Sequence, residues 1–188
     1  MSTLIVTNVK NTSSATNNIV TNTDGSATIG GASLLLSTAV ASTSGTSIDF
    51  TSIPSYVKRI TVMFQNISLS GSDQLLIQLG DSEGVETTGY NSSTDYLLGN
   101  ISSGHDGSTA GFILFVGTNT NRISGTVVLN NISGNFWIAT GIYNFSNYLG
   151  VIGWTAGEKE LSSTLTSIRI TGSAAGAFDS GSVNIMYE

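Results

Sequence analysis

The chain has 188 residues, and its composition excludes several classes of protein. Only 10% of the residues are charged, whereas a soluble domain usually carries roughly 25%. The net charge of −6 argues against the clustered basic face that nucleic-acid binding requires. Cysteine is absent, which excludes disulfides and thiol chemistry. No apolar run reaches the roughly 18 residues of a membrane-spanning helix, so no membrane insertion is expected.

Residues 1–45 differ in composition from the rest of the chain and predict an extended N-terminal arm. They contain no aromatic residue and only two charged ones. Short strands are indicated at 19–20 and 27–29, on either side of Asp24-Gly25, a dipeptide typical of hairpin turns. A polar segment with strand propensity and too few apolar residues for its own core is expected to pair with other chains. Disorder of the isolated arm is the alternative interpretation.

Residues 46–188 predict an antiparallel β-sandwich of jelly-roll-like type. Ile60, Val62 and Phe64 alternate with polar residues, which is typical of a half-buried strand. Similar short runs follow, separated by clusters of Gly, Asn and Ser, and no segment keeps a helical period. Further strands are expected at 75–79, 112–117, 126–132, 136–143, 151–155, 165–171 and 182–187. We therefore expect an all-β fold.

Residues 81–111 form the longest stretch without a clear alternation and are predicted to be a loop. Loops of this length in a compact domain are usually functional or flexible. The first group of candidate ligand-binding residues comes from this stretch and comprises Asp95, Tyr96, His105 and Asp106. A second group surrounds an expected turn and comprises Tyr143, Asn144 and Tyr148. Both groups are chosen on loop position and residue type alone.

The pair His105-Asp106 raises the question of a Ser-His-Asp triad. Such a triad needs a nucleophile on a strained turn, and no G-x-S-x-G element is present. The sequence leaves a glycosidase pair of carboxylates open, because that pair is defined by its separation in space. The acids are few, however, and none lies in an aromatic-flanked cluster. We therefore expect a protein that is not an enzyme.

An acidic run, Asp81 to Glu86, is the strongest candidate for a cation site. Asp81, Glu83 and Glu86 offer the oxygen ligands that Ca²⁺ prefers, but Gly84 does not fit the spacing of an EF-hand. A solvated acidic turn after a strand is the favoured interpretation. No phosphate-binding glycine loop is present either. The sequence thus predicts no metal and no cofactor.

The aromatic residues have two interpretations. Phe136, Trp137 and Trp154 lie in expected strands, while Tyr143 and Phe145 lie near an expected turn. Aromatic rings beside Asn and Asp side chains would suit sugars, which they bind by stacking and hydrogen bonding. The same rings could instead fill the core and subunit interfaces, and this second interpretation is favoured because aromatics dominate the energetics of both.

Four stretches of sequence resemble known segments of virion proteins. IDFTSIP at 48–54, VKRITVMF at 57–64, QLGD at 78–81 with ETTGY at 86–90, and the ending FDSGSVNIMYE resemble a module recurrent in structural proteins of tailed bacteriophages and prophages. The stretch around Asp24-Gly25 and ATIG at 27–30 resembles anchoring segments that precede such modules in phage fibres. Residues 91–111 and 117–160 match least.

The resemblance implies a virion protein, a short tail fibre or similar appendage, assembled as a homotrimer in the host cytoplasm without a signal peptide. The arm would attach to other virion proteins, and the sandwich would point outward and contact bacterial surface polysaccharide. The family pattern carries no catalytic residues. Because the chain lacks the long stalk of large fibres, a capsid decoration or cement protein without a ligand is the alternative. A depolymerase is the third hypothesis.

Overall fold

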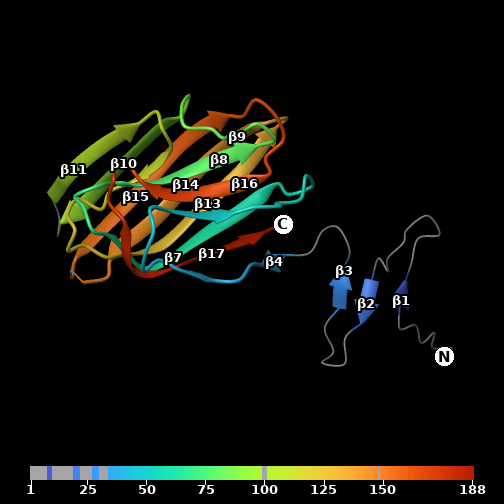
Figure 1. Cartoon of the computed structure of the whole chain (residues 1–188), viewed down its shortest axis with the longest axis horizontal. Helices are drawn as coiled ribbons and strands as arrows, with labels where there is room; N and C mark the ends of the chain where they lie inside the picture. The colour runs from blue at the N-terminus through green and yellow to red at the C-terminus, as the bar shows by residue number, and fades with distance from the viewer. Residues whose placement is uncertain (1–7, 10–18, 22–26, 30–33, 99–100, 148) are drawn as a thin grey trace.

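The computed structural model describes residues 8–9, 19–21, 27–29, 34–98, 101–147 and 149–188. All regular elements among these residues are β-strands, arranged in three antiparallel sheets (Figure 1). The predicted all-β class is therefore confirmed. None of the described residues forms a helix that is long and apolar enough to cross a membrane.

A nine-stranded sheet, called the large sheet below, forms one layer of the sandwich. In order across it lie β11 (Ile101–Ser108), β10 (Asn91–Leu98), β15 (Val151–Glu160), β14 (Phe136–Phe145), β13 (Ile123–Ser133), β7 (Arg59–Leu69), β17 (Phe178–Tyr187) and β4 (Leu35–Leu36). The two-residue strand β5 (Val40–Ala41) also pairs with β17. Consecutive strands β13, β14 and β15 form a meander, as hairpin connections favour.

A five-stranded sheet, called the small sheet, forms the second layer and lies face to face with the large sheet (Figure 1). Its order is β12 (Phe112–Leu114), β8 (Leu75–Asp81), β16 (Ser167–Gly172) and β6 (Ser47–Phe50), and β9 (Gly84–Val85) pairs with β8. The two layers enclose one apolar core, so the predicted antiparallel sandwich is confirmed. Core residues from both layers include Ile60, Val62, Phe64, Val127, Leu129, Ile77, Leu79, Ile168 and Ile170.

The third sheet contains β1 (Asn8–Val9), β2 (Ile19–Thr21) and β3 (Ala27–Ile29). Strands β2 and β3 pair antiparallel, with Ile19 opposite Ile29. This confirms the predicted pairing on either side of Asp24-Gly25, although the dipeptide itself lies outside the described residues.

The stretch 81–111 is not a loop, so this prediction was wrong. It contains β9, β10 and β11, and β10 pairs with β15 along its whole length. Two of the inward positions of β10 are held by the buried hydroxyl residues Ser92 and Thr94. The Thr94 hydroxyl donates to the Trp154 carbonyl at 2.9 Å. Because small hydroxyl residues occupy these positions, the strand lacks the apolar alternation that sequence patterns detect.

Strands β4 and β5 place part of the predicted arm on the edge of the large sheet. Leu36 lies opposite Met186, and Val40 lies opposite Val183, both on β17. Ser42, immediately after β5, is fully buried. The predicted boundary between arm and sandwich, at residue 45, therefore lies beyond two strands that already belong to the large sheet.

Candidate functional site

One row of side chains crosses the outer face of the large sheet, the face that points away from the core. Asp95 on β10 lies opposite His105 on one side and Trp154 on the other. Trp154 in turn lies opposite Ile142 on β14. The row continues through Thr126 on β13, Met63 on β7 and Asn184 on β17. We call these seven residues the cross-strand row.

A hollow of about 510 Å³ opens at the β11 end of this row. We call it the Trp154 hollow after the indole that lines it, which is 39% exposed. It is lined by Ser93, Thr94, Asp95, His105, Asp106, Gly107, Trp154 and Ala156. A volume of this size suits a small ligand or part of a longer one.

Asp95 presents its carboxylate on the outer face, whereas Asp106 lies opposite the inward Thr94 and turns its carboxylate to the inner side of β11. Asp95 Oδ1 accepts a hydrogen bond from its neighbouring Tyr96 amide at 2.6 Å. Asp106 Oδ1 accepts from the Gly107 amide at 2.8 Å, and Oδ2 accepts from Gln74 Nε2 at 3.4 Å. An ionised carboxylate has acceptor capacity for several donors, which suits Asp95 to the hydroxyl groups of a ligand. The indole face offers an apolar surface beside this carboxylate.

The structure brings together three of the four residues in the first predicted group. Asp95, His105 and Asp106 all line the Trp154 hollow. Tyr96 points toward the inside of the sandwich and stacks on two other rings. The distance between ring centroids is 4.4 Å to Phe115 and 5.9 Å to Phe145. Its ring therefore supports the sandwich interior beneath the hollow.

The second predicted group does not form a surface site among the described residues. Tyr143 is only 1% exposed, and its hydroxyl lies 2.7 Å from Thr94 Oγ1 and accepts from the Phe115 amide at 2.9 Å. Burial raises the pKa of this phenol. Asn144 is exposed on the outer face of β14, opposite Ile152. Tyr148 lies outside the described residues.

Trp154 is the site residue that the predicted groups omit. In β15 the small residues Gly153 and Thr155 point inward, while Ile152 and Trp154 point outward. This inverts the usual pattern, in which the larger apolar residues of a strand are buried. A sequence signal was available, because a strand alternating Gly and Thr with Ile and Trp has its large side chains on one face.

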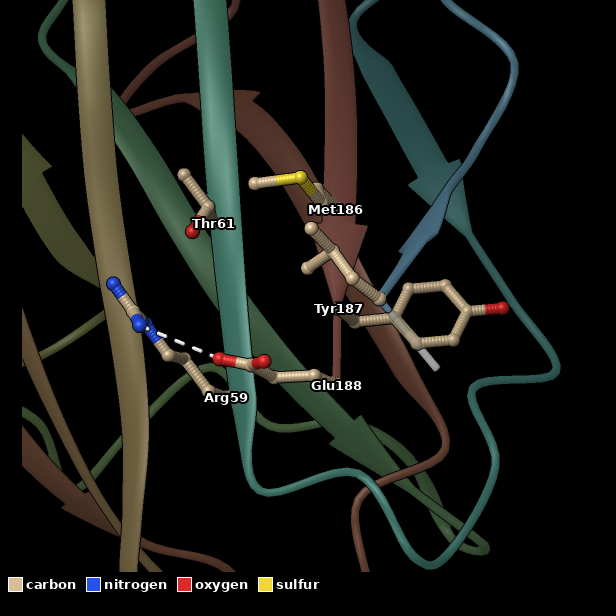
Figure 2. A pocket seen from close by; sticks show the side chains of 6 residues that line it. Arg59, Thr61, Met186, Tyr187 and Glu188 are labelled. Atoms are coloured by element: carbon tan, nitrogen blue, oxygen red, sulfur yellow. Dashed lines mark hydrogen bonds and ion pairs between the residues drawn. The ribbon is translucent and has the colours of Figure 1, made fainter. Parts of the chain in front are cut away.

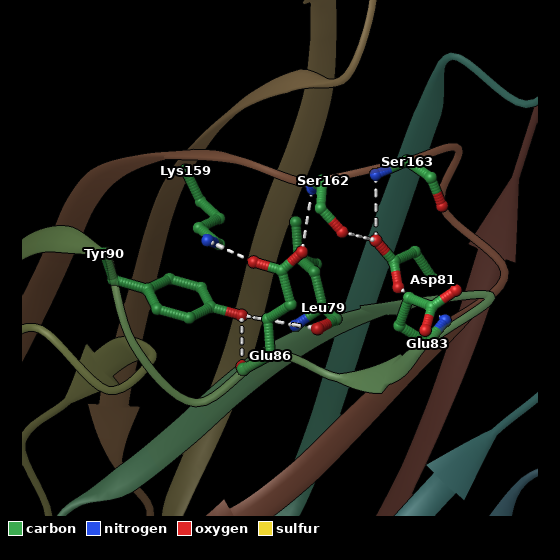
Figure 3. Close-up of polar contacts among 8 residues, drawn as sticks. All are labelled: Leu79, Asp81, Glu83, Glu86, Tyr90, Lys159, Ser162 and Ser163. Atoms are coloured by element: carbon green, nitrogen blue, oxygen red, sulfur yellow. Dashed lines mark hydrogen bonds and ion pairs between the residues drawn. The ribbon is translucent and has the colours of Figure 1, made fainter.

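The acidic run 81–86 divides in two: Glu83 lies in an exposed turn directly after β8, as expected, whereas Asp81 and Glu86 belong to a polar network (Figure 3). Asp81 is only 4% exposed and accepts three hydrogen bonds. They come from Ser162 Oγ at 2.7 Å, the Ser163 amide at 2.9 Å and the Glu83 amide at 2.9 Å. The Ser162 hydroxyl is the largest cause that lowers the pKa of Asp81 to about 2.

Glu86 and Tyr90 extend this network to β15 (Figure 3). Glu86 forms an ion pair with the buried Lys159 and accepts from the Ser162 amide at 2.8 Å. The Tyr90 hydroxyl accepts from the Leu79 amide at 2.7 Å and donates to the Glu86 carbonyl at 3.0 Å. Asp81 and Glu86 are thus both held by protein donors, and the network joins the two sheets at one end of the sandwich. No group of three or more His, Asp or Glu within the described part of the chain is placed to hold a metal ion.

A smaller hollow of about 200 Å³ lies where β7, β17 and the start of β4 meet (Figure 2). Arg59 and Glu188 form an exposed ion pair there, with 3.3 Å between Nη1 and Oε1. Leu34, Thr61, Met186 and Tyr187 complete the lining. The hollow combines one ion pair with the side chains of Leu34, Met186 and Tyr187.

Comparisons of the chain with family models, with curated proteins and with solved structures gave no significant match. The function is therefore argued from the chemistry of the site.

Proposed function

We propose that this chain is a structural protein of a bacteriophage virion, a short trimeric tail fibre or appendage that contributes to attachment to a glycan of the host surface. The observation that carries the attachment role is the Trp154 hollow, in which an exposed indole lies in one row with Asp95 and His105. The virion context is supported by the sequence resemblance described above.

The lining of the hollow fits the chemistry of sugars. A pyranose ring has an apolar face, which packs on an indole, and a rim of hydroxyl groups, which donate to carboxylates. Asp95 lies opposite Trp154 in the sheet, so an acceptor and a stacking surface are side by side. Binding sites of this kind combine an apolar surface with a few placed polar groups.

The role is non-catalytic in this proposal. Asp81 and Glu86 are engaged by Ser162, Ser163 and Lys159. Asp95 lies on the outer face of β10, where it serves as a hydrogen-bond acceptor. The arm, which contains the separate sheet of β1, β2 and β3, would contact other virion proteins.

Replacing Trp154 with Ala tests the attachment role. We expect binding to bacterial surface polysaccharide to weaken at least about tenfold, which corresponds to roughly 1.4 kcal/mol, because the stacking surface is lost. Binding would be measured on an array of surface polysaccharides and on whole cells of candidate hosts. The thermal midpoint should change little, since the indole lies on the outer face.

Tyr56→Ala is the matched control, because this exposed aromatic residue lies outside the hollow. It should bind as the wild type does. If the wild type binds no bacterial surface while particles lacking the protein fall apart, the alternative function, a capsid decoration or cement protein without a ligand, replaces the attachment role.

A further inference from the structure

We propose that the Trp154 hollow is one end of a longer groove, and that this groove takes an extended, uncharged polysaccharide chain lying across the strands of the large sheet. The inference rests on the proposed attachment function. It adds the class of glycan and the direction in which the glycan chain lies relative to the strands. It is carried by a second hollow, two of whose lining residues lie directly opposite lining residues of the first.

The second hollow has a volume of about 300 Å³ and lies over β13 and β14. It is lined by Thr126, Val128, Thr140, Gly141, Ile142 and Thr155. Two of these residues are direct neighbours of the first hollow, because Ile142 lies opposite Trp154 and Thr140 lies opposite Ala156. The two depressions therefore meet at β14 and β15 and form one groove from β11 to β13.

Two adjacent rows of side chains explain why the groove exists. The cross-strand row forms one side, with the large residues Trp154 and Ile142 next to each other. The neighbouring row lies two residues away from the cross-strand row on each strand and consists of smaller side chains. It comprises Gly107, Ser93, Ala156, Thr140 and Val128. A ridge of large side chains beside a row of small ones leaves a channel perpendicular to the strands.

The length of the groove favours a chain over a single sugar. It crosses five strands, β11, β10, β15, β14 and β13, and hence four gaps between neighbouring strands. At about 4.8 Å per gap the groove is about 19 Å long. A monosaccharide in the Trp154 hollow would leave the half over β13 and β14 empty.

The charge of the groove favours an uncharged glycan. The Asp95 carboxylate lies at one end, and none of the described residues that line either hollow is Lys or Arg. The described residues that line the other end are uncharged. Uronate, sialate or phosphate groups on a glycan would meet the Asp95 carboxylate, and juxtaposed like charges select against such partners.

A second copy of this chain is the competing occupant, because Ile142 is 62% exposed beside Trp154. The polar residues of the groove argue against it. A dry protein interface would cover Ser93, Asp95 and Thr140 and remove water from them, which is costly unless each gains a new partner. A glycan carries hydroxyl groups along its whole length and can supply those partners.

The experiment places a charge in the far hollow and leaves the Trp154 hollow intact. Thr140 is exposed, so Thr140→Glu puts a bulky carboxylate into the groove over β14. Ser47→Glu is the matched control, because Ser47 is an exposed strand residue on the small sheet. The probes are the neutral polysaccharides dextran, levan and galactomannan, disaccharides and longer oligomers prepared from each, and the anionic polysaccharides alginate and hyaluronan.

The full-length wild type should bind at least one neutral polysaccharide and neither anionic one, and its affinity should rise with oligomer length. Thr140→Glu should weaken binding of the long oligomers about tenfold and leave disaccharide binding unchanged. Trp154→Ala should weaken binding of long oligomers and of disaccharides, and Ser47→Glu should change neither. Binding of the anionic polysaccharides, or no dependence on length, would overturn the inference and leave the proposed function standing.

Two other outcomes count against the inference in different ways. No binding of any polysaccharide by the wild type would overturn the proposed function together with it. A lower native mass of Thr140→Glu or Trp154→Ala, compared with the wild type and Ser47→Glu, would show that this face joins copies of the chain and would overturn the glycan groove.

Discussion

Asp81 is a carboxylate whose charged form is stabilised by donors from Ser162, Ser163 and Glu83. Its pKa of about 2 lies below the ordinary value of 3.8, so the folded state favours the ionised form. A depressed pKa contributes stability that is present above pH 3.8 and is lost as the pH falls through about 2. The wild type should therefore lose unfolding free energy between pH 4 and pH 2.

Asp81→Asn tests this residue-scale prediction. We expect the variant to be about 1–3 kcal/mol less stable than the wild type at neutral pH, because an amide presents one acceptor where the carboxylate has two. The difference should shrink as the pH falls from 4 toward 2, measured by denaturant unfolding at each pH. Glu160→Gln, at an exposed position, is the control and should show no such convergence. An unchanged difference across this pH range would contradict the role assigned to the Asp81 charge.

At the scale of elements, β4 and β5 protect the edge of β17. The Ser37 amide donates to the Ile185 carbonyl and the Ser42 amide to the Gly181 carbonyl, each at 2.9 Å. The buried Ser42 hydroxyl adds a hydrogen bond to the Ser180 carbonyl at 2.7 Å. Without these short strands β17 would be an open edge, which promotes pairing between molecules.

Two truncated chains separate the effect of these strands from that of the arm. A chain of residues 43–188 should lose at least about 2 kcal/mol of unfolding free energy, since each lost hydrogen bond contributes about 1 kcal/mol, and should aggregate more readily. A chain of residues 34–188 keeps β4 and β5 and should match the full-length protein. Equal stability of the two truncated chains in urea unfolding would show that the edge strands contribute nothing.

Much of the fold follows from the sequence, because most strands alternate apolar and polar residues. Ile60, Val62 and Phe64 are buried as their spacing predicts. The pattern fails where polar groups replace apolar ones inside the sandwich. In β10 the inward Ser92 and Thr94 satisfy backbone groups with their hydroxyls, so a true strand is indistinguishable from a loop by composition.

The candidate site was predictable only in part. Asp95 and His105 are ten residues apart in sequence, and their position opposite each other depends on the β10–β11 register. The predicted role of Tyr143 depended on exposure, yet its ring occupies the space inside β15 that Gly153 leaves free. A Cβ built on Gly153 would lie 2.4 Å from two Tyr143 ring carbons. Because Gly153 faces inward against this ring, the next residue of the strand, Trp154, faces outward. The contact between Gly153 and Tyr143 is visible only in the tertiary structure.

At the scale of the whole molecule, low charge and exposed apolar side chains favour an assembly. Mean hydropathy is +0.19, and Leu34, Leu35, Leu36 and Val40 are exposed together near the edge of the large sheet. Apolar side chains exposed near one edge are typical of interaction surfaces. The resemblance to phage fibres implies a homotrimer, so we expect a native mass of three times the 19.5 kDa chain, measured by light scattering or native mass spectrometry.

Leu36→Glu should shift the mass toward that of the single chain, because it places a charge in the patch. Leu149→Glu is the control, since Leu149 is almost fully exposed at a turn away from this edge. A wild type that is a stable, folded monomer at micromolar concentration would contradict the trimer.

The order of strands across the two sheets also determines how the chain must fold. Strand β6 pairs only with β16, and the Asp49–Arg169 ion pair between them closes a separation of 120 residues. Strand β7 likewise has β17 as one of its two neighbours. Contacts so distant in sequence form late and slow the search for the native state, so refolding from denaturant should take roughly milliseconds to seconds. During synthesis on the ribosome, β6 stays unpaired until β16 has emerged, and the two layers of the sandwich close together in one late, cooperative step.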